Sequence, residues 1–195
     1  MNKMALFRSV LLATIGMLVL GGCGGSYERY LLSMPATVPP AGTTRLGQIG
    51  VDKVSVPGYL SGTKIPIQNT KETLSYCSDA VWASPPEKGL SEHAIAYLQR
   101  RLGTPNVYRY PWEIERKQGL RIKIALSRFL YIAARNGVVL EASYFIEPLS
   151  GTRRISRLYR TFEPVPKGET PQIVSAMNRA YDRLLESIAQ GIMHF

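Results

Sequence analysis

Cysteine and histidine are scarce in this sequence, and their scarcity removes the groups on which much enzyme chemistry depends. The chain has two cysteines, Cys23 and Cys77, and two histidines, His93 and His194. A serine or cysteine triad needs a histidine as its base, but neither histidine has a suitable setting. No cluster has metal-ligand spacing, and no phosphate-binding loop or dinucleotide fingerprint is present. The sequence therefore predicts no catalytic residue, no metal and no cofactor.

Long apolar runs are also lacking, except near the N-terminus. Residues 9–20 form an uncharged run of about a dozen residues, whereas a helix that spans a bilayer needs roughly 20. Lys3 and Arg8 precede this run and small residues follow it, which is the pattern of a secretory signal peptide. Residues 1–22 are therefore predicted to be removed on export. The 173 residues that remain are enough for one domain with a hydrophobic core.

The signal peptide ends in a motif that explains the position of the first cysteine. Leu20-Gly21-Gly22-Cys23 resembles the lipobox of bacterial lipoproteins, in which cleavage falls just before a cysteine that becomes lipidated. The resemblance implies a diacylglyceride and an N-acyl chain, palmitate included, on Cys23, and three chains anchor a protein stably. Lipoproteins held at the inner membrane usually carry Asp after the cysteine. Because Gly24 stands there, we expect an outer-membrane protein that faces the periplasm. The alternative is a soluble periplasmic protein with a chance cysteine.

Acidic residues are outnumbered by basic ones, with 14 Asp and Glu against 24 Lys and Arg. The predicted mature chain keeps a net charge of +8, because both charges of the signal peptide are basic. The densest basic run contains Arg153, Arg154, Arg157 and Arg160. It is interpreted either as an edge strand that charge protects from aggregation or as a contact for anionic lipid headgroups or an acidic partner. Nucleic acid is not expected as a partner of an exported protein.

The mature N-terminus is predicted to be a tether. Residues 24–45 are rich in glycine, proline, serine and threonine, so residues 23–45 are interpreted as a lipidated N-terminus and flexible linker. Only the more apolar stretch YERYLLSMP, residues 27–35, is suited to a first edge strand. The domain is expected over residues 46–195. With Cys23 lipidated, Cys77 has no partner within the chain, and it is interpreted as a small strand residue, with an intermolecular disulfide left open.

Strand patterns dominate the predicted domain. Apolar residues between 46 and 60 predict a strand whose phase slips at Asp52-Lys53, and short strands are expected near residues 64–68, 73–78 and 106–111. Residues 121–132 and 138–146 alternate strongly, and Asn136-Gly137 between them predicts a tight hairpin turn. A further strand is expected over residues 153–165.

Two helices are predicted to pack on these strands. Ser84-Pro85-Pro86-Glu87 has the form of a capping box and opens a helix that Gly103 ends. Thr170-Pro171 is expected to open a last helix with apolar residues at helical spacing. The expected fold class is α+β: a single domain with an antiparallel β-meander packed by two main helices.

Three residues are candidates for contact with a partner. Arg128 falls in phase with the apolar residues of its predicted strand, so either a bulge turns it outward or it is a paired charge in a functional groove. Tyr59 and Leu60 follow Pro57-Gly58, and they either end a strand or place an aromatic and an aliphatic side chain on a turn.

Several segments together resemble one protein family. They are Val54-Ser55-Val56-Pro57-Gly58-Tyr59-Leu60, Trp82-Ala83-Ser84-Pro85-Pro86, Ser127-Arg128-Phe129 and Leu140-Glu141-Ala142. Their order and spacing resemble the ABC-type transport auxiliary lipoproteins, the family of the paraquat-inducible protein C lipoproteins, from about residue 29 to 190. Family members usually have Trp-Ala-Glu-Pro-Leu in place of Trp82-Ala83-Ser84-Pro85-Pro86. Ser84 and Pro86 are the two positions that depart, and this departure bears on the subfamily rather than on the fold.

The resemblance implies an outer-membrane lipoprotein that docks on the periplasmic tunnel of an MCE (mammalian cell entry) domain protein. With its inner-membrane complex, that protein moves phospholipid or other hydrophobic molecules between membranes. The residues expected to bind this partner or outer-membrane phospholipid are Tyr59, Leu60, Trp82, Arg128, Arg154 and Arg157. The alternatives are a structural lipoprotein of outer-membrane assembly and a displayed periplasmic enzyme or inhibitor. The sequence leaves the oligomeric state open, a homo-oligomer included.

Overall fold

The computed structural model describes residues 27–32, 38–40, 47–112 and 119–195. The predicted signal peptide, Cys23 and Gly24 lie outside these ranges. The strands are β1 (Glu28–Tyr30), β2 (Gln48–Val51), β3 (Lys64–Gln68), β4 (Leu74–Trp82), β5 (Val107–Arg109), β6 (Gly119–Ile132), β7 (Gly137–Pro148) and β8 (Ile155–Pro164). The helices are α2 (Pro86–Arg101) and α3 (Thr170–Met193), and two short 3-10 turns are η1 (Gly58–Leu60) and η2 (Ala133–Arg135).

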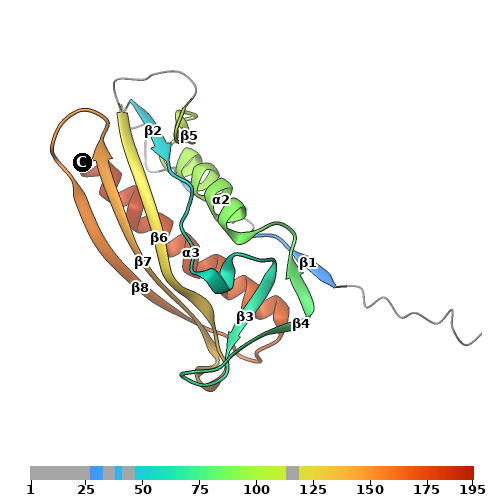
Figure 1. Ribbon diagram of the computed structural model, residues 1–195. Helices are drawn as coiled ribbons and strands as arrows, with labels where there is room; N and C mark the ends of the chain where they lie inside the picture. Colours follow the sequence, from blue (N-terminus) through green and yellow to red (C-terminus); the bar gives the residue numbers. More distant parts are fainter. Residues whose placement is uncertain (1–26, 33–37, 41–46, 113–118) are drawn as a thin grey trace, which may run out of the picture.

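All of these strands belong to one curled sheet with β6 at its centre (Figure 1). One edge of β6 pairs with β7 along almost its whole length, and β7 pairs with β8, both antiparallel. The other edge pairs in parallel with β2 near the start of β6 and with β3 near its end. The expected α+β class is confirmed, and β6–β8 form the expected meander. The parallel pairs were not expected, because strand patterns do not identify partners that are distant in sequence.

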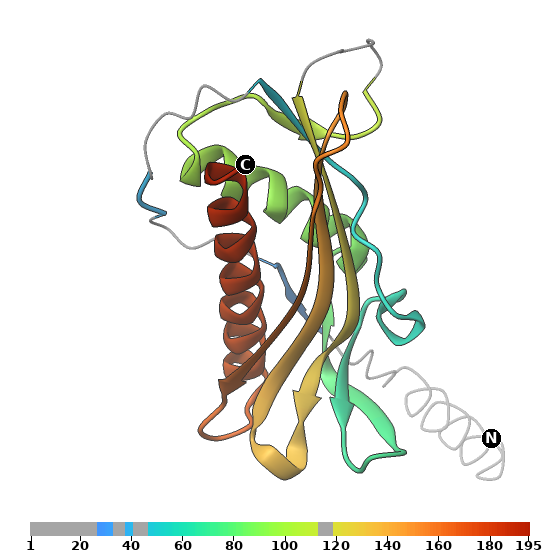
Figure 2. The same cartoon turned by 90° about the vertical axis from the view of Figure 1, so that its left-hand side faces the viewer.

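Both helices pack on the inner face of the sheet, where the hydrophobic core lies (Figure 2). Alternate residues of β7, from Val138 to Ile146, point into this core. The predicted stripe of α3 is confirmed, because Ile173, Met177, Ala180, Leu184 and Ile188 are all buried. The outer face of β6–β8 is covered by neither helix. In the described part of the chain, neither helix has an apolar stretch long enough to cross a bilayer.

The helix termini differ from the predicted caps. Helix α2 begins at Pro86 after Pro85, and no side-chain cap hydrogen bond forms, so Ser84 does not close the expected capping box. Helix α3 begins at Thr170 itself after Glu169, again without a side-chain cap. In both helices a proline in the first turn starts the helix, since its fixed φ is helical and its missing N–H would be unpaired there. Gly103 follows α2 with φ of +61°, as expected of a terminating glycine.

The hairpin between β6 and β7 is confirmed, but its turn is longer than predicted. Ile132 pairs with Gly137, so the four residues 133–136 form the connection. Asn136 takes the left-handed conformation after η2, with φ of 44°. Asparagine tolerates that conformation better than most residues, so the dipeptide marks the end of the turn rather than the whole of it.

Part of the predicted tether is built into the domain. Strand β1 pairs in parallel with β4, as an edge strand in the place expected for one, with Glu28 opposite Ala80. Farther along, the Pro39 carbonyl accepts a hydrogen bond of 3.2 Å from Arg101, and Val38 packs against the core. These contacts fix two points of residues 23–45, so the linker is not a free coil along its length.

Candidate functional site

A β-bulge in the middle of β6 decides which side chains reach the outer face. Leu126 pairs with Ala142 and Arg128 with Glu141, so Ser127 is an extra residue without an opposite partner. An extra residue reverses the alternation of the strand. Phe129 and Tyr131 therefore enter the main core, while Leu130 and Ile132 form a small separate cluster with Val139. The prediction that Leu130 and Ile132 share a face with Ile122 was wrong for this reason.

Arg128 is turned outward by the bulge and is also paired. Its guanidinium lies 3.7 Å from the Glu141 carboxylate and donates a hydrogen bond to the side-chain oxygen of Gln68. The bulge and the pairing are thus both present at Arg128, and a functional role for it stays a prediction. Arg160 from β8 approaches the same Glu141 carboxylate at 3.2 Å, so one carboxylate lies between two arginines.

Tyr59 fills a gap beside the bulge on the other edge of β6. Ser55 bridges to Ala125 and Ile67 of β3 pairs with Tyr131, which leaves the edge between them without a strand. There the Phe129 N–H donates a 3.0 Å hydrogen bond to the Tyr59 hydroxyl. Burial raises the pKa of Tyr59, so the hydroxyl stays neutral. Turn η1 thus satisfies a backbone group that would otherwise be costly to leave unpaired.

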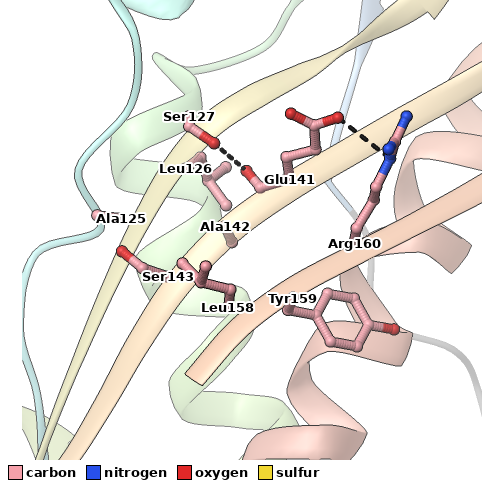
Figure 3. A pocket seen from close by; sticks show the side chains of 9 residues that line it. All are labelled: Ala125, Leu126, Ser127, Glu141, Ala142, Ser143, Leu158, Tyr159 and Arg160. Atoms are coloured by element: carbon pink, nitrogen blue, oxygen red, sulfur yellow. Dashed lines mark hydrogen bonds and ion pairs between the residues drawn. The ribbon is translucent and has the colours of Figure 1, made fainter. Parts of the chain in front are cut away.

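Two shallow hollows meet at the bulge on the outer face. The first, of about 490 Å³, crosses β6, β7 and β8 (Figure 3). Small side chains form its floor because Ala125 stands opposite Ser143. Leu158 at its side is 90% exposed. The residues lining it are Ala125, Leu126, Ser127, Glu141, Ala142, Ser143, Leu158, Tyr159 and Arg160.

The second hollow, of about 500 Å³, lies between η1, the β3–β4 loop and the bulge. The residues lining it are Tyr59, Gln68, Lys71, Glu72, Thr73, Leu74, Ser127, Arg128 and Leu130. Ser127 lines both hollows, and its hydroxyl donates to the Glu141 carbonyl at 3.2 Å. We name the two together the bulge groove. It combines apolar side chains with an excess of arginine and lysine over carboxylates.

The sequence-predicted contact residues separate into two groups. Tyr59 and Arg128 lie together in the bulge groove. Arg154 lies just before β8, with its guanidinium 4.0 Å from the centre of the Phe145 ring. Arg157 is exposed on β8 but lies opposite the buried Tyr144, so it is on the other face of the strand from Leu158 and the groove. Leu60 is fully buried, so its side chain cannot contact a partner of the folded domain.

Trp82 is likewise a core residue, with only 2% of its surface exposed. Trp82 pairs with Tyr30 of β1 and its side chain belongs to the core, so it offers no accessible contact. Leu158 was missed by sequence reasoning. In the sequence Leu158 stands out only as an apolar residue inside the basic run. That pattern does not indicate which face of β8 the Leu158 side chain occupies.

His93 has a structural environment between the two helices. It is buried, and its Nε2 lies 2.7 Å from the Asp182 carboxylate of α3. The partner of this ring nitrogen is thus a carboxylate and not a nucleophile. In the described ranges no three His, Cys, Asp or Glu side chains form a metal site. Cys77 is half-buried in β4, where burial raises the pKa of its thiol, so the reactive thiolate is disfavoured.

The domain thus has a curled sheet with its helices on one face and the bulge groove on the other. Comparison with known proteins supplies the family. The family model described as "ABC-type transport auxiliary lipoprotein component" matches residues 30–189. The chain belongs to this family, which is one of transport components and not of enzymes. A search of curated proteins found no match.

Solved structures agree on the fold. A structure titled as that of an uncharacterized protein superposes with a TM-score of 0.70 at 17% identity, and the match covers 86% of this chain and 99% of that chain. A Xanthomonas campestris protein of the DUF330 family superposes with a TM-score of 0.67 at 18% identity, covering 86% and 93%. At these identities the similarity establishes the fold alone.

Proposed function

We propose that this protein is the outer-membrane lipoprotein of an MCE-type system that moves lipid between membranes. It is anchored through acyl chains on Cys23 and docks through the bulge groove on the periplasmic tunnel protein of that system. Its family is one of transport auxiliary lipoproteins, and this membership supports a role beside a transporter. The lipobox-like motif ending at Cys23 supports the anchor.

The observation that supports the docking site is a hollowed sheet face that neither helix covers, whereas both helices pack on the opposite face. Leu158 projects from the hollowed face with 90% of its surface exposed. Small side chains around it leave room for a partner's side chains. Interfaces of this type place apolar anchors at the centre and charged residues at the rim, and Arg128 and Arg160 lie at such a rim. The partner surface is therefore expected to be apolar with acidic residues around it.

The mechanism in this proposal is mechanical. The acyl chains hold the domain at one membrane, and the groove holds the end of the tunnel protein close to that membrane. Lipid then has a shorter aqueous distance to cross. The protein contributes position and specificity to this step, and no bond to the lipid is made or broken.

Affinity purification from membranes tests the proposal. The tagged wild-type protein is expected to retain an MCE-domain protein. Leu158→Asp places a charge in the groove without disturbing the core, since Leu158 is almost fully exposed, and we expect it to weaken retention by tenfold or more, about 1.4 kcal/mol. The matched control is Tyr108→Asp on β5, because Tyr108 is 38% exposed and does not line the groove.

Two results would contradict the proposal in different ways. If wild-type protein retains no MCE-domain partner, the assignment to this transport system is wrong. If both variants retain the partner equally well, the partner binds elsewhere on the domain and the bulge groove is not its docking site.

A further inference from the structure

Strand β1 lies close to the proposed lipid anchor. Glu28, the first residue of β1, is five residues after Cys23. A fully extended chain covers at most about 3.5 Å per residue, so the two Cα atoms lie within about 17 Å of each other. This inference rests on the proposed acylation of Cys23. If those acyl chains lie in a bilayer, β1 is held near the headgroups.

β1 is held firmly to the rest of the domain. It pairs with β4 from Glu28 to Tyr30, and the Ala83 N–H donates to the Tyr30 carbonyl at 2.8 Å. Tyr30 and Leu32 pack against the core. The short distance from Cys23 therefore constrains the whole domain, because β1 does not hang on a loose tail.

The outward side of this segment carries apolar side chains that the described residues leave mostly exposed. Tyr27, Arg29 and Leu31 alternate with the inward-facing Tyr30 and Leu32, and Tyr27 is 58% and Leu31 65% exposed. Tyrosine favours the membrane–water interface because its ring is apolar and its hydroxyl is polar. Arginine can keep its charge among headgroups while its stem lies on apolar surface.

The charges around this segment are mixed. Glu28 lies beside Arg29, and Asp79 on β4 contributes a negative charge near Tyr30. Electrostatic attraction to anionic lipid is therefore weak here, and contact with a bilayer would depend on the two apolar side chains and on the nearby acyl chains.

We propose that Tyr27, Arg29 and Leu31 form a membrane-contacting edge that lies in the headgroup region of a phospholipid bilayer. β1 and β8 are at opposite ends of the sheet (Figure 1). The path from β1 through β4, β3, β6 and β7 to β8 crosses five strand spacings, about 24 Å along the sheet. With the edge at β1 in the headgroups, Leu158 at the β8 side of the bulge groove lies away from the membrane.

A depth-dependent quenching experiment tests this edge on the acylated full-length protein. A fluorescent label is attached at Leu31→Cys or, as the matched control, at Leu158→Cys, each in a Cys77→Ala background. The protein is reconstituted in vesicles of phosphatidylethanolamine and phosphatidylglycerol that contain a headgroup-depth quencher lipid. We expect strong loss of fluorescence for the label at position 31 and little loss at position 158.

The possible failures are distinguishable. If the protein does not co-sediment with the vesicles, the acyl anchor is absent and the proposed function fails together with this inference. If it co-sediments but the label at position 31 is quenched no more than the label at position 158, the anchor stands and the membrane-contacting edge is wrong. A Tyr27→Ser variant with the label at position 31 adds a graded readout, since losing the neighbouring aromatic is expected to reduce the quenching.

Discussion

Single residues fix the local geometry where strands turn into helices, and Gly168 shows this most clearly. It has φ of +67° just before α3, and a Cβ placed there would lie 2.7 Å from the Tyr131 hydroxyl. That hydroxyl donates to the Asn136 side chain at 3.0 Å. Gly168 therefore lets the chain pass close to the β6–β7 hairpin before α3 begins.

Gly168→Ala is expected to destabilise the domain by about 1–2 kcal/mol, because a left-handed conformation costs that much for a residue with a Cβ. The control is Gly62→Ala, since a Cβ at Gly62 meets nothing within 4 Å, and we expect it to change stability by less than about 0.5 kcal/mol. Urea unfolding followed by circular dichroism measures both. Equal effects of the two substitutions would show that the conformation of Gly168 is not limiting.

At the scale of elements, polar contacts join the two helices as well as apolar packing. Arg101 of α2 binds the Glu186 carboxylate of α3 through two hydrogen bonds of 2.7 and 2.8 Å. The Tyr97 hydroxyl donates to the same carboxylate at 3.0 Å. The hydrogen bonds from Arg101, the main cause, lower the pKa of Glu186 below its ordinary value.

The lowered pKa predicts the sign of the pH dependence. A carboxyl group with a lowered pKa in the folded state stabilises the fold above its unfolded pKa, and that stability is lost as pH falls through the folded pKa. Glu186→Gln is expected to lower stability by about 1 kcal/mol at pH 7, since the pair is partly exposed to solvent. The variant should also lose less stability than the wild type as pH falls below about 4.5.

Denaturant midpoints measured from pH 7 to pH 3 check this prediction. Glu72→Gln, in the exposed β3–β4 loop, serves as the control and should keep the wild-type dependence on pH. If Glu186→Gln keeps that dependence too, the contact between Arg101 and Glu186 does not stabilise the helix pair.

At the scale of the whole molecule, the proposed acyl anchor at Cys23 is the feature to test first. Cys23→Ala is expected to leave the precursor uncleaved and to remove the protein from the outer-membrane fraction, because a lipoprotein signal peptidase needs the acylated cysteine. Fractionation of cells that produce the tagged variant measures this. Ser26→Ala is the control, since it leaves the Leu20–Cys23 motif intact. Unchanged fractionation of Cys23→Ala would contradict the anchor.

Much of the fold was predictable from the sequence because periodicity reports burial. The core faces of α3 and β7, the end of α2 at Gly103 and the β6–β7 hairpin follow from local patterns of apolar residues and turn residues. The first half of β6 was also predictable, from Ile122 to Leu126. Beyond Ser127 the same pattern misled for Leu130 and Ile132, because Arg128 indicated a possible bulge without deciding between that and a paired charge in the regular register.

The candidate site was predictable in part. Arg128 was conspicuous because a charge stood in an apolar phase, and Tyr59 because it followed Pro57-Gly58. Their meeting was not predictable, since it depends on β2 and β3 leaving a gap along β6. In the sequence, Leu60 and Trp82 have the residue types of exposed contact residues. Only the packing of the sheet reveals that they are buried.

The sequence by itself determined most of the strands, both helices, the lipobox-like motif that ends at Cys23 and the family resemblance, because each is encoded in residues that are close together along the chain. Only the tertiary structure decided the parallel pairing of β2, β3 and β1, the outward turn of Arg128 and the position of β1 within the domain. These features depend on long-range pairing, and hydrogen bonds between distant strands leave no periodic trace in the sequence.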